Sequence, residues 1–288
     1  MHSPSRRRVL RALAVPLAFA IEGTRLAARQ EHAAAPADDP GTALFRAMRA
    51  HAASLKVTAI APGRPALAVA LRDEPLERYS DPPRNIQDAT LWAWGDSGRP
   101  GAILKVEHMP KRPEATRWLY GLVSLAAGRI EVEFRDDQRW TSTMPGVEMR
   151  PIAEAPAPAA SESVRLSQMK ALARRFSASE GAGGTQGRLQ LRLMPRPLIR
   201  YSDGTLGIRD GALFAFAYGT NPDILLVIES QGPTDTTATW QFGLARLGGG
   251  EPIVALDGKE VWSQSGANPP ARLATYMNRW VPESGEFK

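Results

Sequence analysis

The sequence predicts an α+β fold made of two tandem copies of one unit, in which a helix packs on an antiparallel meander sheet. Residues 67–142 align without a gap on residues 189–264 at an offset of 122, and 22 of these 76 positions are identical, against about five expected by chance. A helical pattern precedes each copy, and each copy contains short apolar or alternating runs bounded by turn residues. Together these observations indicate an internal duplication.

The first expected element of each unit is a helix, because apolar residues recur there at spacings of three and four. These residues are Leu44, Phe45, Met48, Ala52 and Leu55 before the first copy, and Leu166, Met169, Leu172, Ala173 and Phe176 before the second. Thr42 and Ser163 have side chains suited to the N-cap position. We therefore expect one helix at the start of each unit.

The body of each unit is expected to be a curved antiparallel sheet of about five or six strands. In the first unit the strand patterns cover residues 91–94, 102–107, 118–125 and 130–134. Segments rich in Gly, Pro, Asp and Asn separate them, as antiparallel hairpins require. The pattern leaves open whether the two sheets merge into one domain or stay separate.

These patterns divide the chain into five parts. They are an export signal at 1–30, a junction at 31–41, a first α+β repeat at 42–150, a Pro/Ala-rich linker at 151–162 and a second α+β repeat at 163–288. The linker has no core-forming periodicity, and its prolines favour an extended, semi-rigid backbone.

The first thirty residues have the charged, apolar and small-residue order of an export signal. The apolar run at 12–21 is about half of the roughly 20 residues that a helix needs to span a bilayer, and Pro16 interrupts it. An integral membrane anchor is therefore not expected after cleavage. Ala20 and Ala28 are both candidate cleavage sites.

The basic segment at 5–11 resembles the twin-arginine leaders with which bacteria export folded proteins. The resemblance covers only this leader, and Val9 and Arg11 stand where Phe and Lys are common. A general secretory leader is the alternative. The overall pattern is also similar to exported bacterial proteins of unknown function, with no characterised family, and it implies a periplasmic or extracellular location.

Charge and composition exclude several classes of partner and site. The chain has 36 Lys and Arg against 30 Asp and Glu, a net charge of +6. Residues 1–30 hold six Arg and one Glu, so their removal leaves a charge of only +1, and nucleic acid is not an expected partner. The chain has no cysteine, and only His51 and His108 lie outside the leader and its junction. Neither a metal site nor a cofactor is expected.

A set of polar residues recurs in both copies. It comprises Arg78, Tyr79, Asp81, Asp88 and Glu107 in the first copy, and Arg200, Tyr201, Asp203, Asp210 and Glu229 in the second. We interpret it as structural, with aspartates that hydrogen-bond loop amides and arginines that fix the loop to the sheet. Residues with a structural role are needed in both copies of a repeated unit, whereas an active site needs its residues in only one copy. The alternative is an acid/base pair or an oxygen-rich cation site.

The differences between the copies point to a site in the first one. Arg84, Lys105 and His108 stand where the second copy has Leu206, Val227 and Ser230. The candidate ligand-binding residues are therefore Arg84, Lys105 and Asp88, facing the other copy. If the protein is an enzyme, the candidate catalytic residues are Asp88, Glu107 and His108.

The expected function is that of an exported, non-catalytic binding or scaffolding protein, with its groove or shared interface between the copies. Its partner would be an unknown small molecule, a glycan or a protein. Trp118 and Trp140 recur as Trp240 and Trp262, which indicates core positions, whereas Trp280 does not recur. The alternative function is a hydrolase that uses carboxylates of the first copy on a cell-surface polymer.

Overall fold

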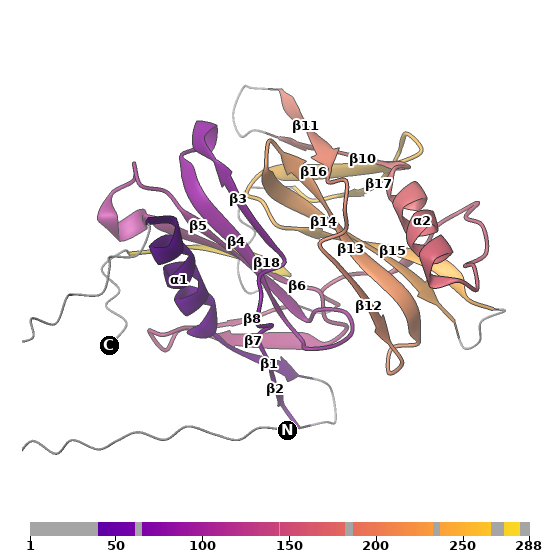
Figure 1. Cartoon of the computed structure of the whole chain (residues 1–288), viewed down its shortest axis with the longest axis horizontal. Coiled ribbons are helices and arrows are strands. Elements are labelled where there is room, and N and C mark those ends of the chain that lie inside the picture. The colour runs from indigo at the N-terminus through magenta and orange to yellow at the C-terminus, as the bar shows by residue number, and fades with distance from the viewer. Residues whose placement is uncertain are drawn as a thin grey trace, which may run out of the picture. The chain divides into compact units, whose positions relative to one another are not determined.

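A computed structural model describes residues 40–60, 65–143, 145–181, 187–232, 237–265 and 274–282 (Figure 1). The predicted export signal, its cleavage sites and most of the junction lie outside these residues. The described part is mainly antiparallel β-structure, with 50% of it in strands and 14% in helical segments. The predicted α+β class is therefore wrong, because the strands form most of the architecture.

The two α-helices of the described residues each cover one face of a sheet. They are α1 (Pro40–Ala53), which contacts β4 (Ile86–Trp94) and β5 (Ala102–His108), and α2 (Glu162–Ala173), which contacts β13 (Ile208–Tyr218) and β14 (Asn221–Gln231) (Figure 1). Met48 and Met169 are fully buried on the inner sides of the two helices. Ser161, rather than the predicted Ser163, occupies the N-cap position of α2.

The remaining strands alternate with short turns. In the first half they are β1 (Lys56–Ile60), β2 (Leu67–Val69), β3 (Glu77–Asp81), β6 (Trp118–Ser124), β7 (Arg129–Glu133) and β8 (Arg139–Thr141), with 3-10 turns η1 (Pro82–Arg84) and η2 (Glu114–Thr116). Later in the chain they are β9 (Arg150–Pro151), β10 (Phe176–Gly181), β11 (Arg188–Leu193), β12 (Ile199–Asp203), β15 (Thr239–Arg246), β16 (Glu251–Leu256), β17 (Lys259–Ser263) and β18 (Tyr276–Val281). We call α1 to β8 the first half and α2 to β17 the second half.

The strands form three antiparallel sheets. Their orders are β2-β1-β7-β8, β18-β6-β5-β4-β3 and β17-β16-β10-β11-β13-β14-β15-β9, and β12 pairs with β13 in the last one. An isolated bridge between Leu71 and Trp94 links the two sheets of the first half. The predicted single sheet of five or six strands in each unit is therefore also wrong.

Strands β9 and β18 pair across the two halves. β9 follows the first half in the chain but pairs with β15, whereas β18 follows the second half and pairs with β6. Residues 38–288 accordingly form one compact unit. The predicted linker begins inside β9, and the buried Ile152 that follows donates its backbone N–H to the carbonyl of Trp240. The two halves are therefore not self-contained, because each half pairs with a strand that follows the other half in the chain.

Strand alternation explains why the described residues form three large apolar cores. Trp92 and Trp94 of β4 face the core under α1, whereas Leu91 and Ala93 face the opposite side. There they meet residues of β13 to β15, such as Leu213, in a core shared by the two halves. A third core lies under α2. Strands β4, β5, β13 and β14 are thus buried on both faces, which gives them nearly continuous apolar sequences.

Candidate functional site

Charged side chains gather beside the core that the two halves share. We call Asp81, Arg84, Lys105, Glu107, Glu180 and Asp223 the inter-sheet cluster. Lys105, which is 3% exposed, donates from Nζ to Asn221 Oδ1 at 2.9 Å and to the carbonyl of Pro222 at 3.0 Å. The same ammonium lies 3.5 Å from Glu107 Oε1 and 3.7 Å from Asp223 Oδ1. Lys105 therefore joins a carboxylate of each half.

Arg84 makes the second connection between the halves. Arg84 is the last residue of η1 in the first half. Its Nη1 lies 3.2 Å from Asp223 Oδ2 of β14, and its Nη2 lies 3.4 Å from Glu180 Oε1 of β10. Its guanidinium also lies over the ring of Tyr218, 4.6 Å from the centroid. A single arginine thus holds two carboxylates and one aromatic ring of the second half.

The inter-sheet cluster has four carboxyl groups and two cations, and this imbalance changes its protonation. Burial and the nearby Asp223 carboxylate raise the pKa of Glu180 to about 7, although Arg84 opposes the change. For Lys105, burial alone would lower the pKa, but the carboxylates of Glu107 and Asp223 outweigh it and raise the pKa. The cluster therefore holds a proton on Glu180 in mildly acidic solution.

A tyrosine and a glutamate meet in each half, and a residue of the other half completes the contact. The Tyr79 hydroxyl lies 2.8 Å from Glu107 Oε1 and 3.0 Å from Asn221 Oδ1. In the second half, the Tyr201 hydroxyl donates to Glu229 Oε1 at 2.7 Å, and Arg99 donates to both Glu229 oxygens. Arg99 and Asn221 are themselves related by the offset of 122. Glu229 is thus paired with one arginine outside the inter-sheet cluster, whereas Glu107 belongs to the acid-rich cluster.

The structure separates the predicted site residues into two groups. Arg84, Lys105 and Glu107 come together in the inter-sheet cluster, whereas Asp88 and His108 lie on the α1 side of the same sheet. Asp88 and His108 are directly paired across β4 and β5, so their side chains share one face, and Lys105 and Glu107 fall on the other. The ring centroids of His108 and Trp118 lie 4.5 Å apart. The strand period of two residues causes this division.

The duplicated Arg–Asp pairs attach a helix to each sheet. Arg78 donates to both oxygens of Asp88 and to the carbonyl of Gly41 in α1. Arg200 donates in the same way to both oxygens of Asp210 and to the carbonyl of Glu162 in α2.

Asp210 also accepts a hydrogen bond from the buried Arg165 of α2, at 2.7 Å. The duplicated Asp81 and Asp203 differ in role. Asp203 accepts from the amides of Thr205 and Leu206, whereas Asp81 lies 3.9 Å from Nε of Arg84. Within the duplicated set, the residues that hold a helix or a loop in place are therefore Arg78, Asp88, Arg200, Asp203 and Asp210.

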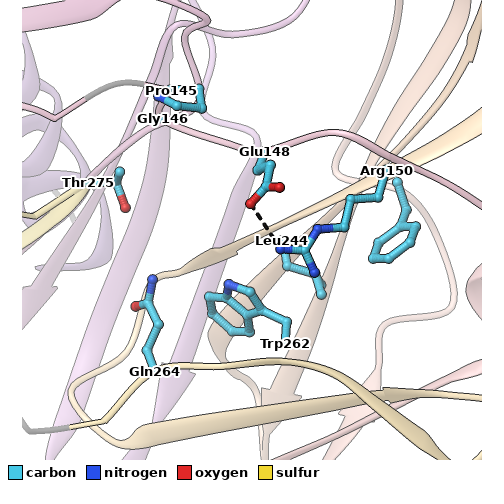
Figure 2. A pocket seen from close by; sticks show the side chains of 9 residues that line it. Pro145, Gly146, Glu148, Arg150, Leu244, Trp262, Gln264 and Thr275 are labelled. Atoms are coloured by element: carbon cyan, nitrogen blue, oxygen red, sulfur yellow. Dashed lines mark hydrogen bonds and ion pairs between the residues drawn. The ribbon is translucent and has the colours of Figure 1, made fainter.

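A pocket of about 190 Å³ opens between the two edge strands of the nine-stranded sheet. We call it the seam pocket; it is lined by Pro145, Gly146, Glu148, Arg150, Phe242, Leu244, Trp262, Gln264 and Thr275. Arg150 of β9 donates to Glu148 Oε2 at 2.9 Å and, across the seam, to the carbonyl of Val261 in β17 at 2.9 Å. Figure 2 shows this ion pair across the opening from the indole ring of Trp262. The pocket thus combines an aromatic wall with a charged rim.

The matching seam of the first half is closed by β18. Met277 of β18 pairs with Leu122, which the offset of 122 relates to Leu244. Phe242 pairs with Arg150, and the same antiparallel register continued by two residues places Glu148 opposite Leu244. Glu148 therefore stands where the first half has Met277.

The side chains at these matching positions differ in burial. Met277 packs against the core of the first half, whereas the Glu148 side chain is 67% exposed. Trp140 is only 4% exposed in the first half, but its counterpart Trp262 is half-buried beside the seam pocket. Trp280, the tryptophan without a counterpart, is 38% exposed and lies under the guanidinium of Arg112. The seam pocket thus lies where the second half has an exposed carboxylate and the first half has an apolar residue packed on its core.

Sequence reasoning missed Glu180, Asp223, Glu148 and Arg150. Asp223 aligns with Gly101, so a gain of charge in the second copy is the sequence signal that marks it, whereas Glu180 precedes the aligned segment. Glu148 and Arg150 lie beyond the aligned segment, and their position depends on the exchange of β9 and β18. No local sequence signal identifies them.

Within the described residues, no helix is long and apolar enough to span a membrane. The same part of the chain contains no group of three or more His, Asp or Glu side chains arranged to hold a metal ion. Neither the family models nor the curated proteins nor the solved structures contain a match to this chain.

Proposed function

We propose that this protein is an exported, non-catalytic binding protein and that its ligand occupies the seam pocket. The observation that carries the proposal is the difference between the two seams. Met277 packs against the core at the first, whereas at the second the exposed Glu148 stands beside a pocket that the core residues Phe242 and Leu244, only 4% and 7% exposed, help to line. An apolar residue at this position would cover the core without help from a ligand, so an exposed charged residue above an apolar-lined pocket supports a binding site here.

The inter-sheet cluster is better suited to a scaffold than to a ligand site. Lys105, Glu107 and Asp223 are buried, and their contacts join the two halves. Removing one partner of such a buried pair leaves an uncompensated charge, which is strongly destabilising. The cluster therefore joins the two halves of the molecule.

The candidate catalytic residues do not support the hydrolase alternative. Asp88 and His108 lie on one face of the sheet and Glu107 on the other, and all three are buried. An acid and a base that act on one bond need to approach it from a shared cavity. Binding, with a small molecule, a glycan or a protein segment as partner, is therefore the function that we propose, and the leader-like segment at 1–30 is the basis for proposing export.

Fluorine NMR of protein labelled with 5-fluorotryptophan tests this function, because the chain has seven tryptophans that report separately. The Trp262→Phe and Trp140→Phe variants assign the two seam resonances. Probes are methyl β-D-glucoside, L-methionine and N-acetyl-L-methionine N-methylamide, each titrated to about 10 mM, which detects millimolar affinity. We expect at least one probe to shift the Trp262 resonance saturably and to leave that of Trp140 unchanged.

The Glu148→Met variant provides the matched control, since it gives the second seam the residue of the first. It should fill the pocket and abolish the response of Trp262. Glu148→Gln removes the charge without adding an apolar group, and it should leave the pocket open. If none of the three probes shifts Trp262, or if they shift Trp140 equally, the proposed function is wrong.

A further inference from the structure

We propose that the ligand of the seam pocket is a small zwitterion with an aliphatic group, of the size of methionine or leucine. This inference rests on the proposed function and adds the chemical class of the ligand. Its basis is the ion pair of Glu148 and Arg150 beside Leu244 and Trp262 (Figure 2), in a lining that also includes Phe242.

The charged rim favours a ligand with both charges. Glu148 and Arg150 lie within hydrogen-bond distance and together carry no net charge. An isolated anion would gain from Arg150 but meet repulsion from Glu148, and an isolated cation would meet the reverse. A ligand with an ammonium and a carboxylate can place each group on its opposite partner, with neither charge left uncompensated.

The guanidinium of Arg150 has capacity for such a ligand. It has five N–H donors, and its contacts with Glu148 and with the carbonyl of Val261 each use one donor of a different Nη. Glu148 is bonded through Oε2, and its side chain is largely exposed. Gln264 and Thr275, which complete the lining, add an amide and a hydroxyl that hydrogen-bond either group of the ligand.

The residue at the corresponding position of the first seam indicates the size of the ligand's apolar group. There, the side chain of Met277 occupies the position that Glu148 leaves open, and it packs against the core that contains Trp140. The ligand would supply the equivalent apolar group in the second half, against Leu244 and Trp262. A methionine-sized side chain therefore matches the space that the internal comparison defines.

A glycan fits this rim less well. Sugars are recognised by neutral hydrogen-bond donors and acceptors around an aromatic platform, and an ion pair beside Trp262 would have to be desolvated without a charged partner. A peptide bond within a polypeptide likewise lacks both charges. The ion pair is thus the feature that separates a free amino acid from the other two classes.

The test compares L-methionine with analogues that remove one feature each, with the Trp262 fluorine resonance as readout. Methionine amide lacks the carboxylate, N-acetyl-L-methionine lacks the ammonium, N-acetyl-L-methionine N-methylamide lacks both, and glycine lacks the side chain. We expect L-methionine to bind at least about tenfold more tightly than each analogue, a difference of about one decade in Kd. Equal binding of the doubly blocked analogue would overturn the inference.

Variants of Glu148 and Arg150 test whether the charged rim of the seam pocket recognises the ligand. Glu148→Gln and Arg150→Gln should reduce the preference for L-methionine over the doubly blocked analogue to less than about threefold. Arg139→Gln is the matched control, because Arg139 forms exposed ion pairs with Glu131 and Glu133 next to Trp140 in the first half. It should leave the preference unchanged. The fluorine resonances of the other tryptophans show that each variant is folded.

The outcomes distinguish the two proposals. If methyl β-D-glucoside or the doubly blocked analogue shifts Trp262 and L-methionine does not, the inference about the ligand class fails and the proposed function stands. If no probe of either panel shifts Trp262, both fail. Saturable binding of L-methionine that depends on Glu148 and Arg150 supports both.

Discussion

Glu180 of the inter-sheet cluster should make a contribution to stability that is lost as the pH rises from about 4.5 to about 7. Burial beside Asp223 raises the pKa of Glu180 from its ordinary value of 4.5 to about 7 in the folded state. The folded protein therefore binds a proton that the unfolded chain releases in this interval. The contribution of protonated Glu180 is fully present below pH 4.5 and is lost as the pH passes through 7.

The magnitude follows from the change in pKa. A rise from 4.5 to about 7 corresponds to about 3 kcal/mol of unfolding free energy at 1.36 kcal/mol for each tenfold change in proton affinity. Glu180 shares its proton affinity with the adjacent Asp223, and Arg84, which bonds it, is partly open to solvent. We therefore expect a loss of about 1 to 3 kcal/mol.

Urea unfolding of the wild type and the Glu180→Gln variant at about pH 5 and about pH 8 measures this loss. The variant stays neutral at both values and keeps an oxygen for Arg84. Relative to the wild type, it should therefore be more stable at pH 8 than at pH 5 by about 1 to 3 kcal/mol. Titrating groups outside the inter-sheet cluster are present in both proteins and cancel in the difference, whereas the coupling between Glu180 and Asp223 is part of what the difference measures.

Glu260→Gln, which removes an exposed carboxylate of β17, is the control and should show no such pH-dependent difference. The reasoning is refuted if the difference between the wild type and Glu180→Gln is independent of pH, or if the variant gains relative stability on acidification.

Three further predictions concern other buried groups. Arg99→Met leaves Glu229, which is fully buried, without its ion pair and should cost about 3 to 5 kcal/mol in urea unfolding; a cost below 1 kcal/mol would contradict the pairing. Burial lowers the pKa of His51 from 6.5 to about 4, so the contribution of His51 to stability should be lost as the pH drops from 6.5 towards 4, and a His51→Gln variant should lack this contribution when compared with the wild type in urea unfolding. Trp140→Ala should destabilise by about 3 to 5 kcal/mol and Trp262→Ala by about 1 to 2 kcal/mol, an order that equal losses would reject.

Local patterns predicted the strands well. The expected runs at 91–94, 102–107, 118–125 and 130–134 lie within one residue of β4, β5, β6 and β7 or inside them. Alternation and turn residues are properties of neighbouring positions, so a strand and its hairpin can be recognised without knowledge of the rest of the fold.

The fold class was predicted wrongly because local patterns do not specify how strands join into sheets. The helical patterns at 40–53 and 162–173 favour an α+β class, but each helix covers only part of a sheet that continues beyond it. Each half also uses a strand from the far end of the other. Such pairing depends on contacts between distant residues, such as Met277 and Leu122.

The candidate site divides in the same way. Sequence pattern specified the cysteine-free composition, the antiparallel strands and the charged residues Arg84, Lys105 and Glu107 that meet in one cluster. Tertiary contacts were needed to separate Asp88 and His108 from that cluster and to bring Glu180 and Asp223 into it. They were also needed to form the seam pocket, because Glu148 and Trp262 become neighbours only when the nine-stranded sheet curls and its two edges approach. The strand period is a local property, whereas the approach of two sheet edges depends on the packing of the whole chain.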